Sequence, residues 1–97
     1  MKICFDSNAE TEHLQAISFY ESQHKGLGGN YLNDFEQTLN SIISSPLRFR
    51  VLRSPDIRSV SLDKFPYKIL FRVAIDEIQI LAVAHKRRRP DYWLVRI

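Results

Sequence analysis

Four residues of the chain are of types that could together cleave a phosphodiester bond: Lys68, His85, Arg87 and Tyr92. RNA cleavage by attack of its own 2′-hydroxyl needs a base with a pKa near neutrality, an acid for the leaving oxygen, and cations for the charge around phosphorus. Histidine suits the first role, tyrosine or protonated histidine the second, and lysine and arginine the third. A purely structural interpretation stays open, because Lys68 and His85 could simply form an exposed cross-strand pair.

The sequence around His85 is strongly basic. An apolar stretch, 78–84, leads directly into His-Lys-Arg-Arg-Arg-Pro-Asp-Tyr-Trp at 85–93. Consecutive cations beside aromatic residues suit a surface that contacts phosphate, nucleic-acid bases or an acidic protein. We therefore predict a binding surface formed by Arg58, Lys68, Arg72, Lys86, Arg87, Arg88, Arg89 and Tyr92.

The charges are divided unevenly along the chain, whose net charge is +3. Residues 1–45 hold two cations and six acids, a net charge of −4, whereas residues 46–97 hold twelve cations and five acids, a net charge of +7. The second half is therefore the expected contact surface for an anionic partner.

Length and composition limit the possible classes. Ninety-seven residues, 44% of them hydrophobic, predict one domain spanning 1–97. No apolar run reaches the roughly 20 residues of a membrane helix, and Asp6 comes too early for a signal peptide. A single cysteine, Cys4, favours a cytoplasmic protein with an unreactive core thiol. Histidines 13, 24 and 85 have no metal-site spacing, so we expect neither metal nor cofactor.

Periodicity predicts a strand at 2–6, two helices and a sheet. Ser7 and Glu10 predict a capping box for a first helix ending near His24. The glycine-rich segment 25–29 predicts a reversal, and a second helix follows until Pro46 disfavours helical backbone. Such amphipathic helices pack as an antiparallel hairpin on a sheet.

The sheet is expected from strands at 57–62, 67–75 and 78–85. Pairing Leu62 with Tyr67 sets Ser61 beside Lys68 and Val60 beside Ile69. A two-residue turn at 76–77 then sets Lys68 opposite His85, Arg72 opposite Leu81, and Ile69 opposite Ala84. The face under the helices would carry Val60, Leu62, Ile69, Phe71, Val73, Ile78, Ile80, Ala82 and Ala84. The other face would be open and cationic, unless a one-residue slip exchanged the two.

The aromatic residues and the other histidines have simpler expected roles. Trp93 is expected in a helical turn that folds back and fills the core, while Tyr92 reaches the cationic face with its hydroxyl free. His13 is expected to pack on the first helix, and His24 to lie in the solvent-facing cap region.

The order of elements and several strings resemble the RelE/ParE family of bacterial toxins. The matching strings lie at 16–21, 26–28, 42–46 with Phe49, 57–58, 65–69, 81–85 and 88–93. The resemblance implies an α+β fold, β-α-α-β-β-β, with a helical hairpin on one face of a small, mainly antiparallel sheet. It also implies an antitoxin partner, acidic and partly disordered when free, that forms a hetero-oligomer with the toxin.

Two activities occur in that family, and fold does not choose between them. RelE-like members cut mRNA on the ribosome, and the resemblance gives Lys68 and Arg87 phosphate-stabilising roles and His85 or Tyr92 the acid–base role. ParE-like members inhibit DNA gyrase. Ser59 and Ser61 stand where RelE-like nucleases have paired lysines, which favours gyrase inhibition over metal-independent mRNA cleavage. A non-toxic basic RNA-binding module is a third interpretation.

Overall fold

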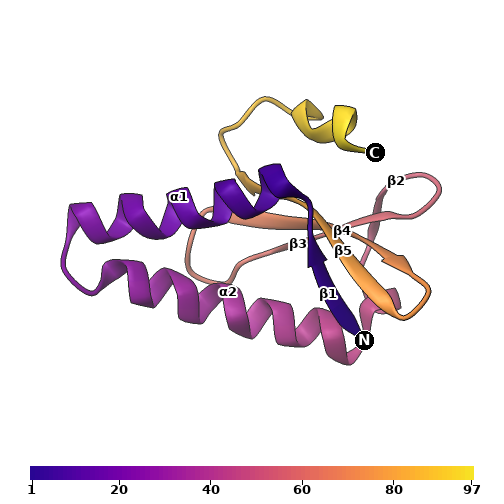
Figure 1. The fold of residues 1–97 in the computed structure, drawn as a ribbon, viewed down its shortest axis with the longest axis horizontal. Coiled ribbons are helices and arrows are strands. Elements are labelled where there is room, and N and C mark those ends of the chain that lie inside the picture. Colours follow the sequence, from indigo (N-terminus) through magenta and orange to yellow (C-terminus); the bar gives the residue numbers. More distant parts are fainter.

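A computed structural model describes all residues of the chain, 1–97. The elements, in order, are β1 (Lys2–Phe5), α1 (Ser7–Gln23), α2 (Leu27–Ser44), a 3₁₀ turn η1 (Pro46–Arg48), β2 (Val51–Arg53), β3 (Ile57–Ser61), β4 (Tyr67–Ala74), β5 (Glu77–His85) and a second 3₁₀ turn η2 (Tyr92–Arg96). The strands form one sheet in the order β1-β5-β4-β3-β2. Figure 1 shows the long α1–α2 hairpin extending to one side of this sheet.

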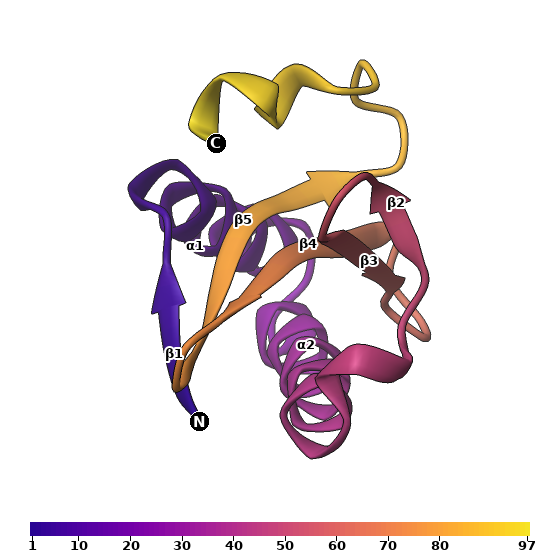
Figure 2. The same cartoon turned by 90° about the vertical axis from the view of Figure 1, so that its right-hand side faces the viewer.

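The fold class predicted from the sequence is confirmed. β1 pairs with β5 in parallel, and the remaining neighbours are antiparallel. Both helices pack on one side of the sheet, whereas the C-terminal segment, which we define as residues 86–97, crosses its other side (Figure 2). The short, exposed edge strand β2 was not predicted, because three residues are too few for a recognisable alternation. No helix is long and apolar enough to cross a membrane.

The start of α1 differs from the prediction by one residue. Asp6, not Ser7, is the N-cap, and its carboxylate accepts hydrogen bonds from the Asn8 and Ala9 N–H groups. An aspartate satisfies the free N–H groups of a first turn as well as serine does, and its charge also complements the helix dipole.

The reversal between the helices is tighter than predicted, because α2 already begins at Leu27. Gly26 has φ +88°, a left-handed conformation that glycine adopts without a steric penalty. The Glu21 carboxylate accepts hydrogen bonds from the N–H groups of Gly26 and Gly28, so α1 itself caps α2. A Cβ atom on Gly28 would lie 2.7 Å from the Ile17 carbonyl oxygen, so the two helices approach closely only with glycine there.

The β3–β4 register is as predicted, but the β4–β5 register is not. Ser61 pairs with Lys68 and Val60 with Ile69. The β4–β5 turn lies at 75–76, and a bulge shifts the register again beyond Leu70 and Phe71. As a result, Arg72 pairs with Gln79, not Leu81, and Ile69 pairs with Val83, not Ala84.

The bulge also corrects the predicted faces of β5. The main core, under the helices, includes Ile78, Ile80 and Val83, whereas Ala82 and Ala84 belong to a second cluster on the opposite face. In that cluster Trp93 packs with them and with Ile57, Leu70 and Leu81. Trp93 is only 2% exposed, which confirms it as a core residue. The second face was expected to be open, and this part of it is covered instead.

Candidate cationic binding site

The C-terminal segment and the end of the sheet enclose a cavity of about 150 Å³, which we call the cationic cavity. Its basic lining comes from Lys68, His85, Lys86, Arg88 and Arg89. Leu52, Ala84, Pro90, Asp91, Tyr92 and Trp93 complete the walls. Cations concentrated in one concave site attract an anionic group more strongly than cations scattered over a surface.

Lys68 and His85 are not the directly facing pair that the sequence predicted. Lys68 pairs with Ala84, whereas His85 pairs with Tyr67 and packs edge-on against its ring at 5.0 Å between centroids. Because side chains of successive strand residues alternate, Lys68 and His85 start from opposite faces of the sheet. Both nevertheless line the cationic cavity, because β5 ends at His85.

The imidazole of His85 already has a local partner. Its Nδ1 accepts a hydrogen bond of 3.0 Å from the backbone N–H of Arg87. A neutral imidazole that accepts at Nδ1 carries its proton on Nε2, so it has no second lone pair to serve as a general base. The geometry therefore suits His85 to donating a hydrogen bond rather than to abstracting a proton.

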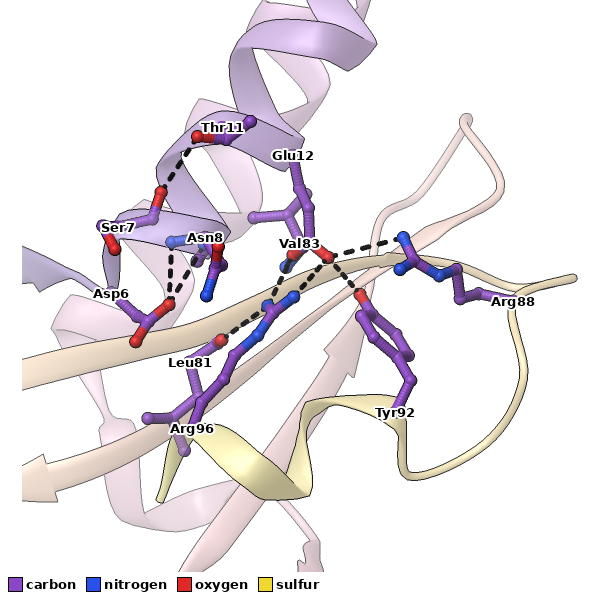
Figure 3. Close-up of polar contacts among 11 residues, drawn as sticks. Asp6, Ser7, Asn8, Thr11, Glu12, Leu81, Val83, Arg88, Tyr92 and Arg96 are labelled. Carbon is purple, nitrogen blue, oxygen red and sulfur yellow. Dashed lines mark hydrogen bonds and ion pairs between the residues drawn. The ribbon is translucent and has the colours of Figure 1, made fainter.

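Tyr92 does not present a free hydroxyl to the cavity, contrary to the prediction. Its hydroxyl donates a 2.6 Å hydrogen bond to Oε2 of Glu12 on α1 (Figure 3). Burial and this bond to a carboxylate raise the pKa of Tyr92 well above its usual value. The Arg88 guanidinium stacks over the same ring, 4.0 Å from its centroid.

Glu12 is the centre of the contacts in Figure 3. Its carboxylate accepts two hydrogen bonds of 2.9 Å from Arg96 and one of 3.0 Å from the Val83 N–H group. The side chains of Glu12 and Arg96 are only 10% and 9% exposed. Burial alone would raise the pKa of Glu12, but its bonds to Arg96, Tyr92 and Val83 outweigh that effect and lower it. Glu12 is therefore a charged, nearly buried anchor for the C-terminal segment.

Three predicted members of the binding surface, Arg58, Arg72 and Arg87, do not line the cationic cavity. Arg58 points to the helix side, since its strand partner is Phe71, and donates hydrogen bonds to the carbonyls of Leu47 and Phe49. Arg72 donates to the Gln79 amide oxygen and lines a different hollow near β1. Arg58 holds the segment before β2, and neither residue extends the cavity.

The remaining predicted cations lie on the C-terminal segment. Lys86, Arg87 and Arg89 are exposed, and none of their side chains forms an ion pair with an acid. Arg88 is half-exposed and lies 3.7 Å from the Glu12 carboxylate. No group of three or more histidine, cysteine, aspartate or glutamate side chains is placed to hold a metal ion.

Sequence reasoning missed Glu12 and Arg96. Glu12 follows the buried Ala9 by three residues and precedes the buried Ala16 by four, which places an acid on the buried side of α1. Arg96 ends the short helical turn that Tyr92 begins, and its guanidinium lies 5.0 Å from the centroid of the Tyr92 ring. An acid on an apolar stripe is rarely buried without a partner, and this was the available signal.

Comparisons with known proteins support the architecture. No protein-family profile and no curated protein sequence matches this chain. Among solved structures, the chromosomal ParDE toxin–antitoxin system of P. aeruginosa aligns with a TM-score of 0.74 and 18% identity, over 88% of this chain and 95% of that one. This chain has the RelE/ParE toxin fold. The isolated E. coli RelE toxin aligns at 0.67 and 17% identity, over 97% and 93%. A double arginine-to-alanine mutant of RelE in the free state aligns at 0.66 and 15%, over 98% and 90%.

Within this RelE/ParE fold, the cationic cavity differs from the nuclease pattern implied by the sequence resemblance. Ser61 pairs with Lys68 and Ser59 with Leu70, so both serines lie on the face of the sheet that carries Lys68. On this face, the hydroxyl groups of Ser59 and Ser61 lie where the resemblance to RelE-like nucleases implies two lysines. The cations of the cavity come instead from Lys68 on β4, from the end of β5 and from the residues after it.

Proposed function

We propose that this protein is the growth-inhibiting toxin of a type II toxin–antitoxin module. The observation that carries the proposal is the likeness of nearly the whole chain to both a ParDE system and the RelE toxin. The concentration of cations at the end of β5 adds support, because both proposed targets, gyrase on DNA and the ribosome with mRNA, contain nucleic acid.

We propose further that the toxin acts by binding, with DNA gyrase as its target. Three features favour binding over nuclease chemistry. The His85 Nδ1 lone pair is occupied by the Arg87 N–H group, the Tyr92 hydroxyl is bonded to Glu12, and Ser59 and Ser61 supply no cations. A general base and an acid are therefore both held in other contacts, while the charged binding surface stays accessible.

A second candidate is a ribosome-dependent mRNA endoribonuclease. It is favoured by one observation, namely that Lys68, His85, Arg88 and Arg89 line one cavity where a phosphate could contact several cations. In that case His85 would leave Arg87 when substrate binds. A non-toxic RNA-binding module is the weaker third candidate.

The proposed partner is an antitoxin with an acidic segment. Lys86, Arg87 and Arg89 have no acidic partners within the chain, so a disordered acidic segment could neutralise them as it folds onto the surface. The resulting complex would be a toxin–antitoxin hetero-oligomer.

Induced expression in a bacterial host tests the function. We expect growth arrest, and we expect the adjoining open reading frame to encode a short acidic protein whose co-expression relieves it. Unimpaired growth at a verified level of folded protein would contradict the toxin proposal.

Two readouts then separate the targets. A gyrase inhibitor induces DNA-damage signalling and stabilises cleaved DNA, whereas a nuclease leaves chromosomes intact and produces new mRNA ends. Lys68→Ala and His85→Ala abolish arrest by a nuclease, and Lys25→Ala, on the exposed helix hairpin, is the matched control. Arrest that persists in both cavity variants, together with damaged DNA, supports gyrase.

A further inference from the structure

The cationic cavity receives part of its shape from a residue that does not line it. Glu12 belongs to α1, whereas the cavity walls come from β2, β4, β5 and the C-terminal segment. Its carboxylate nevertheless holds the hydroxyl of Tyr92, and the ring of Tyr92 forms part of the wall. Glu12 can therefore shape the cavity only through the residues that it contacts.

Arg88 is the cavity cation most directly affected by this contact. It is half-exposed, and it has two interactions within the chain: its guanidinium stacks over the Tyr92 ring at 4.0 Å and lies 3.7 Å from Glu12. A distance of 3.7 Å is too long for a strong hydrogen bond, so the guanidinium keeps donors for another anion. The stack fixes its plane, and Glu12 fixes the ring on which it stacks.

We propose that Glu12 is a positioning residue for phosphate binding in the cationic cavity, acting through Tyr92 to orient the Arg88 guanidinium toward a phosphodiester group. The inference rests on the proposed function only in taking a nucleic-acid-containing target. An arginine held flat on an aromatic ring loses less conformational freedom when it binds phosphate than a free one does.

The proposal predicts that removing Glu12 changes the affinity for phosphate in the direction opposite to that expected from its charge alone. Glu12 is a negative charge close to a cationic cavity, so removing it should strengthen the attraction of an anion if charge alone mattered. If Glu12 orients Arg88, its removal weakens phosphate binding. Glu10→Gln is the matched control, because Glu10 is exposed on the same helix and has no side-chain contact with the C-terminal segment.

The test is the binding of short fluorescent single-stranded RNA and DNA oligonucleotides, measured by anisotropy over a series of salt concentrations. We expect Glu12→Gln and Tyr92→Phe to bind about 3- to 10-fold more weakly than wild type, and Glu10→Gln to bind equally or more tightly. Loss of one phosphate contact should also flatten the slope of log K against log salt by about 0.7. A merely structural role for Glu12 would leave that slope unchanged.

Arg88→Gln supplies the second part of the test. We expect it to match Glu12→Gln in affinity and slope, and the double variant to lose little more than Arg88→Gln alone. Glu12→Gln and Tyr92→Phe that bind as tightly as wild type, or additive losses in the double variant, would overturn the proposal. Tyr92→Phe keeps the ring and all contacts of Glu12 with Arg96, so it serves if Glu12→Gln does not fold.

A wild-type protein that binds neither oligonucleotide also overturns this inference. That result would leave the toxin proposal to be judged by growth arrest alone, so the two failures are distinguishable.

Discussion

The hydroxyl of Tyr92 and the carboxylate of Glu12 form a 2.6 Å hydrogen bond between residues 80 positions apart in the sequence. This contact joins the first helix to the C-terminal segment, and Arg96 strengthens it with two further bonds to the same carboxylate. The segment that carries the run of exposed cations from Lys86 to Arg89 is thus fixed to the helical layer at one point.

Tyr92→Phe tests the stability contributed at that point. Hydrogen bonds to charged groups contribute more than neutral ones, but Glu12 keeps its other partners in this variant. We expect the free energy of unfolding to fall by about 1–2 kcal/mol, measured by urea denaturation. Tyr20→Phe is a control on α1, since the Tyr20 ring packs against Tyr31, Phe65 and Tyr67 and not against the C-terminal segment. An equal decrease in the free energy of unfolding in both variants would show that the hydrogen bond to Glu12 contributes no more than an ordinary tyrosine hydroxyl does.

Gly28 and Gly29 form a matched pair in α2. Alanine at 28 would place its Cβ 2.7 Å from the backbone oxygen of Ile17, whereas alanine at 29 meets nothing within 4 Å. Gly28→Ala should lower the free energy of unfolding by about 1–3 kcal/mol through forced separation of the helices. Gly29→Ala should raise it by up to about 1 kcal/mol, because alanine has the higher helix propensity. Thermal denaturation monitored by circular dichroism measures both, and changes of the same sign would contradict the close approach of α1 and α2.

The side chain of Asp34, on α2, binds the backbone of the loop between β3 and β4. The Asp34 side chain is buried, and its carboxylate accepts hydrogen bonds from the N–H groups of Asp63, Lys64 and Phe65. Asn has only one acceptor oxygen and would turn N–H donors toward these N–H groups. We expect Asp34→Asn to lower the free energy of unfolding by about 2–3 kcal/mol, measured in urea. Asp63→Asn, at an exposed position, is the control, and a comparable effect there would contradict the role of Asp34.

His13 makes stability depend on pH. Its ring is tilted by 35° against the Phe35 ring at 4.0 Å between centroids, and its Nδ1 lies 3.3 Å from the Tyr31 hydroxyl. Burial lowers the pKa of His13 below its ordinary 6.5, although Glu36 and Glu10 partly oppose that effect. The unfolded chain therefore takes up a proton first as the pH falls.

The sign of this effect follows from proton linkage. The His13 contribution is intact above pH 6.5, the ordinary value, and is lost as the pH falls from there toward the lower folded-state pKa. Urea denaturation between roughly pH 5.5 and 7.5 should show decreasing stability toward acid. His13→Phe should remove most of that dependence, because phenylalanine can occupy the aromatic cluster without titrating. A wild-type protein as stable at the acid end as at the neutral end would contradict the assignment.

The helices and the β3–β4 hairpin could be predicted because their patterns are clear. Alternating residues at 57–61 define one register, and glycines followed by a stripe that includes Tyr31 and Phe35 define the helical hairpin. In contrast, the central part of β5, 80–84, is entirely apolar. No alternation of apolar and polar residues indicates which of these side chains face the helices. The bulge could therefore not be predicted from the sequence, and Ala82 and Ala84 were assigned to the wrong face of the sheet.

The candidate site was predicted in composition but not in arrangement. Lys86, Arg88 and Arg89 do line one cavity with Lys68, as their clustering suggested, but Arg87 does not. The predicted free hydroxyl of Tyr92 was wrong, because it bonds to a carboxylate distant in sequence, and the bonds of Arg58 to backbone carbonyls were not foreseen. Local spacing carries no information about partners that only the tertiary fold brings together.

The parallel pairing of β1 with β5 has a consequence for synthesis of the chain. Lys2 to Phe5 cannot join the sheet, and Glu12 cannot find Tyr92 and Arg96, until the residues that follow Ala74 have left the ribosome. We expect nascent chains stalled before Glu77 to be digested rapidly by protease and the released full-length chain to resist it. A cell making this protein would thus have an interval during translation in which a partner could bind the emerging chain before its sheet is complete.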